Sequence, residues 1–98
     1  MQFSIKENSW IAKLAARKLQ SDKVAIVIGK TIHLCRTSQA DFLRDKKWVK
    51  HEICHIDQFK KHGFLIFIIK YLWESFRHGY YNNKYEIEAR NAENQIAE

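Results

Sequence analysis

Proline is absent from this 98-residue sequence, and only three glycines and two cysteines are present. Without proline, an internal repeat or a low-complexity stretch, nothing predicts a linker, so we expect a single domain over residues 1–98. Cys35 and Cys54 lie nineteen positions apart with no second pair. This spacing argues against a disulfide framework and against a four-cysteine zinc site, and it predicts a reducing, cytoplasmic location.

Long hydrophobic runs are also absent. The longest, FLIFII at 64–69, ends at Lys70. It falls far short of the roughly 20 residues that a membrane-spanning helix needs, so we predict no membrane span and place this run in the core. Met1 to Lys6 lack the apolar region of a signal peptide, which again favours the cytoplasm.

Positive charge is in excess, with 17 basic against 11 acidic residues and a formal net charge of +6. The basic residues are scattered, and no run is longer than a pair such as Lys46-Lys47. No motif has the spacing of a base-reading element. We therefore predict a solvated basic surface, and nucleic acid is not the favoured partner.

Apolar periodicity and turn residues predict an α+β fold. Ser9 is the expected N-cap of the first helix, Gly29-Lys30 the turn of a β-hairpin, and Gly63 and Gly79 the ends of two later helices. The expected elements are an N-terminal helix over 9–22, a short hairpin over 23–35, a motif-bearing helix over 41–61, a buried helix over 64–78 and a C-terminal helix over 84–98.

The sequence HEICH at 51–55 carries the strongest chemical signal in the chain. On a helix, His51 and His55 stand about 40° and one turn apart, so both imidazoles can reach one metal ion. Glu52 lies beside them, where a carboxylate can take a proton from a zinc-activated water without occupying the metal. Two surface histidines on a basic helix are the simpler alternative.

A catalytic zinc usually has three protein ligands and one open position, so a third ligand is needed. His62 lies about 10 Å beyond His55 along the helix, which is too far to share the ion. Gln58 and Lys61 occupy the places of the glycine and third histidine of metzincins, which excludes that type. The remaining candidates are Glu86 and Glu88.

The segments WVKHEICHIDQ (48–58) and NNKYEIEAR (82–90) together resemble the gluzincin group of zinc metallopeptidases, in particular the minimal minigluzincin-like domains. The resemblance implies a zincin-like domain in which Glu86 is the third zinc ligand and Glu88 its neighbour or alternative. It also implies that an edge strand holds extended substrate. Arg90 stands where the pattern often has an acidic residue that orients the first histidine.

These observations together predict a zinc metallopeptidase that acts on a peptide or protein, with zinc on His51, His55 and Glu86 and with Glu52 as general base. Tyr80, Tyr81 and Tyr85 are the candidates for stabilising the oxyanion. One alternative is a catalytically inactive basic binding module with structural zinc. Another is a latent enzyme whose acidic end, Glu93–Glu98, supplies a carboxylate to the fourth zinc position. The oligomeric state is not predicted.

Overall fold

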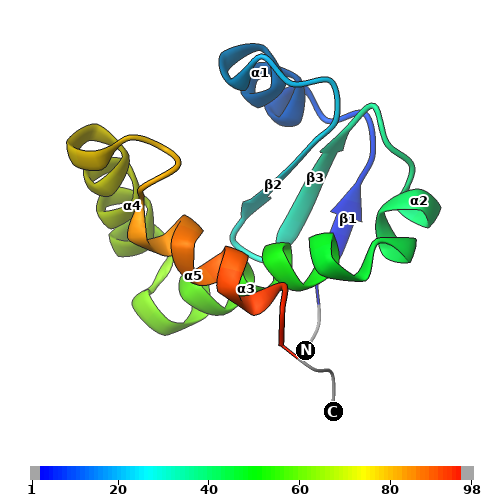
Figure 1. Ribbon diagram of the computed structural model, residues 1–98. Coiled ribbons are helices and arrows are strands. Elements are labelled where there is room, and N and C mark those ends of the chain that lie inside the picture. The colour runs from blue at the N-terminus through cyan, green and yellow to red at the C-terminus, as the bar shows by residue number, and fades with distance from the viewer. Residues whose placement is uncertain (1–2, 96–98) are drawn as a thin grey trace.

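The strands form a three-stranded sheet in which the last strand of the chain lies in the centre. In the computed structural model, which describes residues 3–95, the strands are β1 (Ser4–Lys6), β2 (Val24–Ile28) and β3 (Thr31–Cys35), in the order β1-β3-β2 (Figure 1). β1 is parallel to β3 and β2 is antiparallel to it. β2 is therefore an edge strand.

The predicted hairpin is confirmed. β2 and β3 are joined by Gly29 and Lys30, and Ile28 pairs with Thr31 across the turn. Gly29 has a φ of 66°, a backbone conformation that glycine adopts without strain. β1 was not predicted, because three residues are too few to show a period-two pattern.

The two faces of the sheet are covered by different helices. Helix α1 (Trp10–Leu19) begins at the predicted cap Ser9 and packs against the face that carries Val24 and Cys35. Ile32 and Leu34 alternate to the opposite face, where they enter the main hydrophobic core. Phe42 and Phe59 complete that core from the helices that follow the sheet.

The helix predicted over 41–61 is two helices, α2 (Gln39–Arg44) and α3 (Lys46–His62). Asp45 separates them, because its ψ of 88° is not helical, and its side chain accepts a hydrogen bond from the backbone N–H of Trp48. Asp45 therefore acts as the N-cap of α3, a role that its short acidic side chain suits well. The last helix, α5 (Lys84–Ala92), is shorter than predicted.

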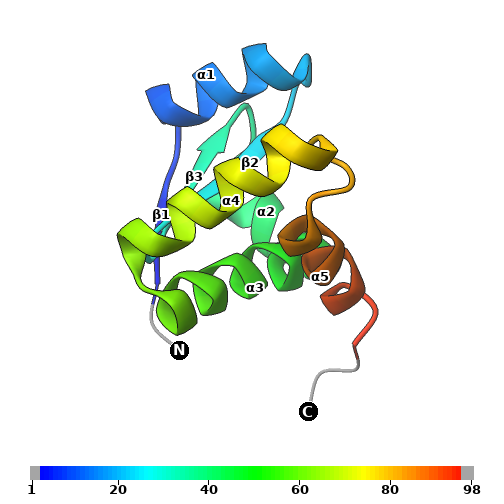
Figure 2. The ribbon, with the colours of Figure 1, turned by 90° about the vertical axis from the view of Figure 1, so that its left-hand side faces the viewer.

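Helix α4 (Phe64–His78) has the predicted bounds, but the prediction that it is buried is wrong. Phe67 is its one fully buried residue, whereas Leu65 and Phe76 are 66% and 83% exposed. The helix packs against α3 along one face only and flanks the sheet beside β2 (Figure 2). Apolar composition shows that a helix can be buried, but it does not supply elements to cover every face. Among the residues described, no helix has the length and apolar character that crossing a membrane requires.

Candidate metal centre

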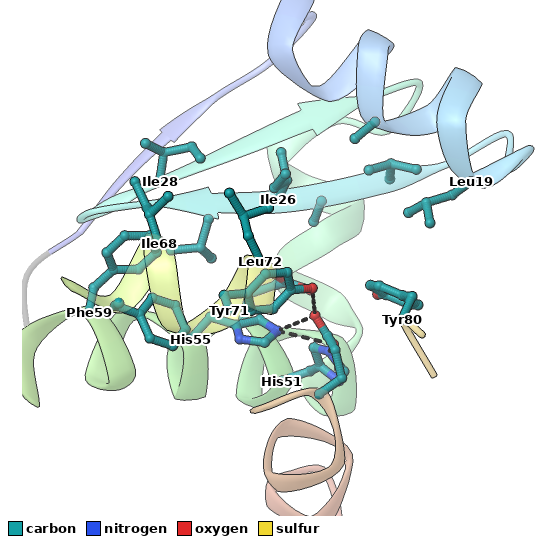
Figure 3. A pocket seen from close by; sticks show the side chains of 17 residues that line it. Leu19, Ile26, Ile28, His51, His55, Phe59, Ile68, Tyr71, Leu72 and Tyr80 are labelled. Atoms are coloured by element: carbon teal, nitrogen blue, oxygen red, sulfur yellow. Dashed lines mark hydrogen bonds and ion pairs between the residues drawn. The ribbon is translucent and has the colours of Figure 1, made fainter. Parts of the chain in front are cut away.

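Helices α3 and α5 bring together three side chains with metal-ligating atoms (Figure 3). The Nε2 atom of His51 lies 3.0 Å from Oε1 of Glu86. The Nε2 atom of His55 lies 3.2 Å from both carboxylate oxygens of Glu86. One ligand atom from each of the three residues lies within 4.8 Å of the others, and all three residues are buried or half-buried. The predicted set His51, His55 and Glu86 is thus close enough to bind one metal ion.

The other nitrogen of each imidazole is also held. Nδ1 of His51 lies 2.6 Å from Oε2 of Glu93, and Nδ1 of His55 lies 2.9 Å from Oε1 of Gln58. Two hydrogen bonds fix the orientation of the Gln58 amide. Its Nε2 donates to the carbonyl of Tyr85 at 3.1 Å and to the carboxylate of Glu88 at 2.7 Å. Both Nδ1 atoms therefore face oxygen acceptors, and both Nε2 atoms face Glu86.

This arrangement requires positive charge between the three side chains. A neutral imidazole has a single N–H, yet each of these rings has an acceptor at both nitrogens, so each would have to be doubly protonated. A divalent cation held by the Nε2 atoms of His51 and His55 and by Glu86 would replace the two extra protons. Two imidazoles, one carboxylate and hydrogen-bonded Nδ1 atoms are a donor set that suits zinc.

The pKa values of His51, His55 and Glu86 are shifted in the directions that favour positive charge on the imidazoles and negative charge on the carboxylate. Burial lowers the pKa of His51, but its hydrogen bond to Glu86 and the charge of Glu52 outweigh burial and raise the pKa to about 9. The same balance raises the pKa of His55. Burial raises the pKa of Glu86, but hydrogen bonds from His51 and His55 hold it well below its usual range. Without metal, the surroundings therefore favour protonated imidazoles beside an ionised carboxylate.

Glu52 is buried next to the three ligating residues and lines the same cavity. Burial raises the pKa of its carboxyl to about 7, although the positive charges of His55 and His51 pull it down. A carboxyl with a pKa near neutrality can both accept and return a proton at physiological pH. Glu52 therefore has the position and the proton affinity expected of a general base.

The cavity has a volume of about 240 Å³ and extends from these residues along the edge strand β2. Its far walls are apolar and include Ile26 of β2, Leu72 of α4 and Leu19 of α1 (Figure 3). The polar end is closed by Tyr71 of α4, whose hydroxyl donates a hydrogen bond to Oε2 of Glu86. Burial and the charge of Glu86 raise the pKa of Tyr71, so its hydroxyl stays protonated and remains a donor.

The three tyrosines predicted as oxyanion donors lie in different surroundings. Tyr80 is half-exposed and lines the cavity beside Tyr71. The ring of Tyr85 is buried in the hydrophobic core against Phe67, and the ring of Tyr81 lies on the surface beneath the guanidinium of Arg90 at 4.0 Å. Of the predicted three, the part of the chain that the structure describes brings only Tyr80 to the cavity.

The alternative ligand Glu88 does not join the ligating group, because its carboxylate accepts from Gln58 on the other side of that amide. Glu93, predicted as part of a segment that blocks the fourth metal position, lies instead at Nδ1 of His51. Residues 96–98 of that segment lie outside the described residues. Arg90 donates to the carbonyl of Tyr81 at 2.6 Å and so takes no part in holding the imidazoles.

Sequence reasoning missed Tyr71 and the contact made by Gln58, and it placed Glu93 at the metal instead of at Nδ1 of His51. Tyr71 could have been found from its spacing, since it follows Phe67 by one turn on the inner face of α4. Gln58 similarly follows His55 by three residues on the same face of α3. Glu93 follows the predicted ligand Glu86 by seven residues, or two turns of α5.

No protein-family model, curated protein sequence or solved structure is significantly similar to this chain. The assignment of function therefore depends on the geometry of the centre and on the two motifs.

Proposed function

We propose that the protein is a zinc-dependent hydrolase, and specifically a metallopeptidase of the gluzincin type. The observation that carries this proposal is the convergence of His51, His55 and Glu86 with a buried carboxylate, Glu52, at one end of a cavity. The two histidines and Glu52 come from one HExxH sequence and Glu86 comes from a later helix, as the gluzincin resemblance implies.

His51, His55 and Glu86 would hold the metal, and three protein ligands leave a position open for water. When bound, zinc would supply Lewis-acid chemistry, lowering the pKa of a water from 15.7 to about 7 and polarising a carbonyl. Glu93 and Gln58 would hold the imidazoles in the ligating orientation through Nδ1.

Glu52 would take the proton from the attacking water and deliver it to the leaving amine. Its burial keeps the carboxylate poorly hydrated and raises its pKa, which favours acceptance of a proton from water. The hydroxyls of Tyr71 and Tyr80 lie at the same end of the cavity and would donate to the oxygen on which negative charge develops. For Tyr71 this requires the hydroxyl to turn away from Glu86.

The cavity suits an extended peptide. β2 pairs with β3 on one side, and among residues 3–95 no strand pairs with its other side. That free edge runs along the cavity and offers main-chain groups to a substrate strand, while Ile26 and Leu72 offer apolar contacts. The free cysteines, buried Cys35 and half-buried Cys54, agree with the proposed cytoplasmic location.

The deciding experiment compares Glu52→Gln with the parent protein in zinc content and in hydrolysis of a library of peptides. We expect the variant to keep zinc and its fold but to lose at least about 100-fold in kcat, the scale of a missing general base. Unchanged turnover with bound zinc would contradict the mechanism. A parent that binds zinc tightly but cleaves no peptide would instead support the inactive binding module with structural zinc.

Two carboxylate variants on α5 make matched controls for the metal. Glu86→Gln should lose zinc, whereas Glu88→Gln should retain it, because Glu88 contacts Gln58 and not the imidazoles. The loss in Glu86→Gln should exceed the roughly 10- to 100-fold effect of changing a residue that only orients a ligand. If Glu88→Gln lost zinc and Glu86→Gln retained it, the third ligand would be Glu88 and the assignment of Glu86 would be wrong.

A further inference from the structure

The outer face of α4 is an uncovered apolar surface. At 100° per residue, Leu72, Leu65, Phe76, Ile69, Trp73 and Ile66 occupy one arc of roughly 120°, and more than half of each side chain is exposed. Arg77 and Lys70 come next around the helix, and the guanidinium of Arg77 lies 5.7 Å above the ring of Trp73. The helix therefore presents a wide apolar face with cations along one border.

Helix α1 continues this surface on the far side of the cavity. Trp10 is 65% exposed, and Leu14 follows it one turn later. α1 carries three basic residues, Lys13, Arg17 and Lys18, and no acidic residue. In Figure 2, α1 lies above the sheet and α4 crosses in front of it, and Leu19 and Leu72 line one cavity between the two helices. We name the exposed side chains of Trp10, Leu14, Leu65, Ile69, Trp73 and Phe76 the α1–α4 surface.

Single exposed apolar residues are ordinary, but a wide apolar face on a helix with cations beside it usually marks a binding surface, and both α1 and α4 carry one. Two tryptophans and a phenylalanine beside lysine and arginine form a combination that lies in the boundary between lipid headgroups and acyl chains. Neither helix can cross a bilayer, since α1 has 10 residues and α4 has 15. A bilayer contact would therefore be peripheral, with both helices lying in the plane of the membrane surface.

We infer that the α1–α4 surface binds the headgroup layer of an anionic lipid membrane. The charges select lipid over a second copy of the chain. A twofold pair would bring together two copies of one patch, and the charged residues of α1 in that patch are all basic, so the pair would offer them no opposite charge. Glu74, the acidic residue of α4, stands about 80° around the helix from Ile66, the nearest residue of the apolar arc, and so lies outside the patch. An anionic lipid surface satisfies the apolar side chains and the cations together.

The inference stands apart from the proposed hydrolase, because no residue of the α1–α4 surface ligates metal or lies beside Glu52. Its test is co-sedimentation of the full chain, without added metal, with two kinds of vesicle. One kind is phosphatidylcholine alone and the other is phosphatidylcholine mixed with phosphatidylglycerol. We expect binding to the mixed vesicles that weakens with added salt, and at most weak binding to phosphatidylcholine alone.

Two double variants separate the apolar and charged contributions. Trp73→Ser with Phe76→Ser should weaken binding to mixed vesicles by at least about tenfold, because both side chains would otherwise insert. Arg17→Gln with Lys18→Gln should weaken binding to mixed vesicles by roughly 30-fold, because each lost cation contributes about 1 kcal/mol and about 2 kcal/mol corresponds to that change in affinity. Leu43→Ser, an exposed apolar change on α2, should leave binding unaltered. All these side chains are exposed, and circular dichroism checks that each variant folds.

Three results would overturn the inference. The first is absence of binding to mixed vesicles. The second is equal binding by the parent and both double variants. The third is a parent that forms dimers which Trp73→Ser with Phe76→Ser dissociates while vesicle binding is unchanged, since this surface would then pair with a second copy.

Discussion

The guanidinium of Arg90 stands where the gluzincin pattern often has a carboxylate, and the structure places that carboxylate one turn further along the chain. Arg90 and Glu93 are three residues apart, a spacing that brings side chains to neighbouring positions on a helix. Glu93 contacts Nδ1 of His51, whereas Arg90 contacts the carbonyl and ring of Tyr81. In this chain Glu93, and not the residue at position 90, makes the contact to the imidazole.

Removing this contact should weaken metal binding without removing a ligand. In Glu93→Ala, we expect zinc affinity to fall by roughly 10- to 100-fold, because the imidazole of His51 loses the acceptor that fixes its orientation. Competition with a chromogenic chelator measures this affinity. Arg90→Ala is the matched control and should bind zinc as the parent does; the opposite ranking of the two variants would refute the role of Glu93.

The raised pKa of His51 also makes the metal-free protein sensitive to alkali. The folded-state pKa of about 9 lies above the 6.5 of an unperturbed histidine, so protonation of His51 stabilises the folded state. This contribution is complete below pH 6.5 and is lost as the pH rises toward about 9. Urea unfolding of the metal-free chain should show falling stability across this window. His51→Gln should flatten the profile there, and an unchanged slope in that variant would contradict the assignment.

At the scale of elements, α4 and α5 are joined through one buried residue. Asn83 is fully buried, caps α5 by accepting from the backbone N–H of Tyr85, and donates to the carbonyl of Tyr71 and to the hydroxyl of Ser75. It fixes the start of the helix that carries Glu86 to the helix that carries Tyr71. The amide of Asn83 therefore helps to position both Tyr71 and Glu86 at the polar end of the cavity.

We expect Asn83→Ala to lower the free energy of unfolding by about 2–4 kcal/mol, because it removes an N-cap and leaves buried polar groups without partners. Denaturant unfolding of the metal-free protein measures the loss. Asn82→Ala, a change in the adjoining loop, is the control and should cost well under half as much. Equal losses in the two variants would show that the amide of Asn83 does not hold the two helices together.

The elements differ in how far the sequence could predict them. Caps and turns are local, so Ser9, Gly29 and Gly63 were assigned correctly from their neighbours. The three candidate metal-binding residues could be predicted from the sequence, because His51 and His55 share one helix face and the gluzincin resemblance pointed to Glu86. Burial of α4 was not accessible, because exposure depends on what packs over a helix and not on its own residues.

At the scale of the whole molecule, a metal would join α3 to α5 across 35 residues of chain. The unfolded chain does not hold these ligands together, so zinc should bind the folded state far more tightly. At a free zinc concentration 100 times Kd, the stabilisation should be about 2.7 kcal/mol, which corresponds to a rise in Tm of roughly 10–20 °C. Calorimetry with and without zinc measures it, and Glu86→Gln should show no comparable rise.

The cavity draws its polar end from one part of the chain and much of its apolar wall from another. His51, His55, Glu86 and Tyr71 come from α3 to α5, whereas Ile26 and Leu19 come from the first 28 residues. Among the described residues, no side-chain hydrogen bond links β2 to the ligating group. Because both parts line one cavity, substitutions in them can still couple through it. Selection could reshape what the cavity accepts through β2 and α1 while the metal ligands stay unaltered.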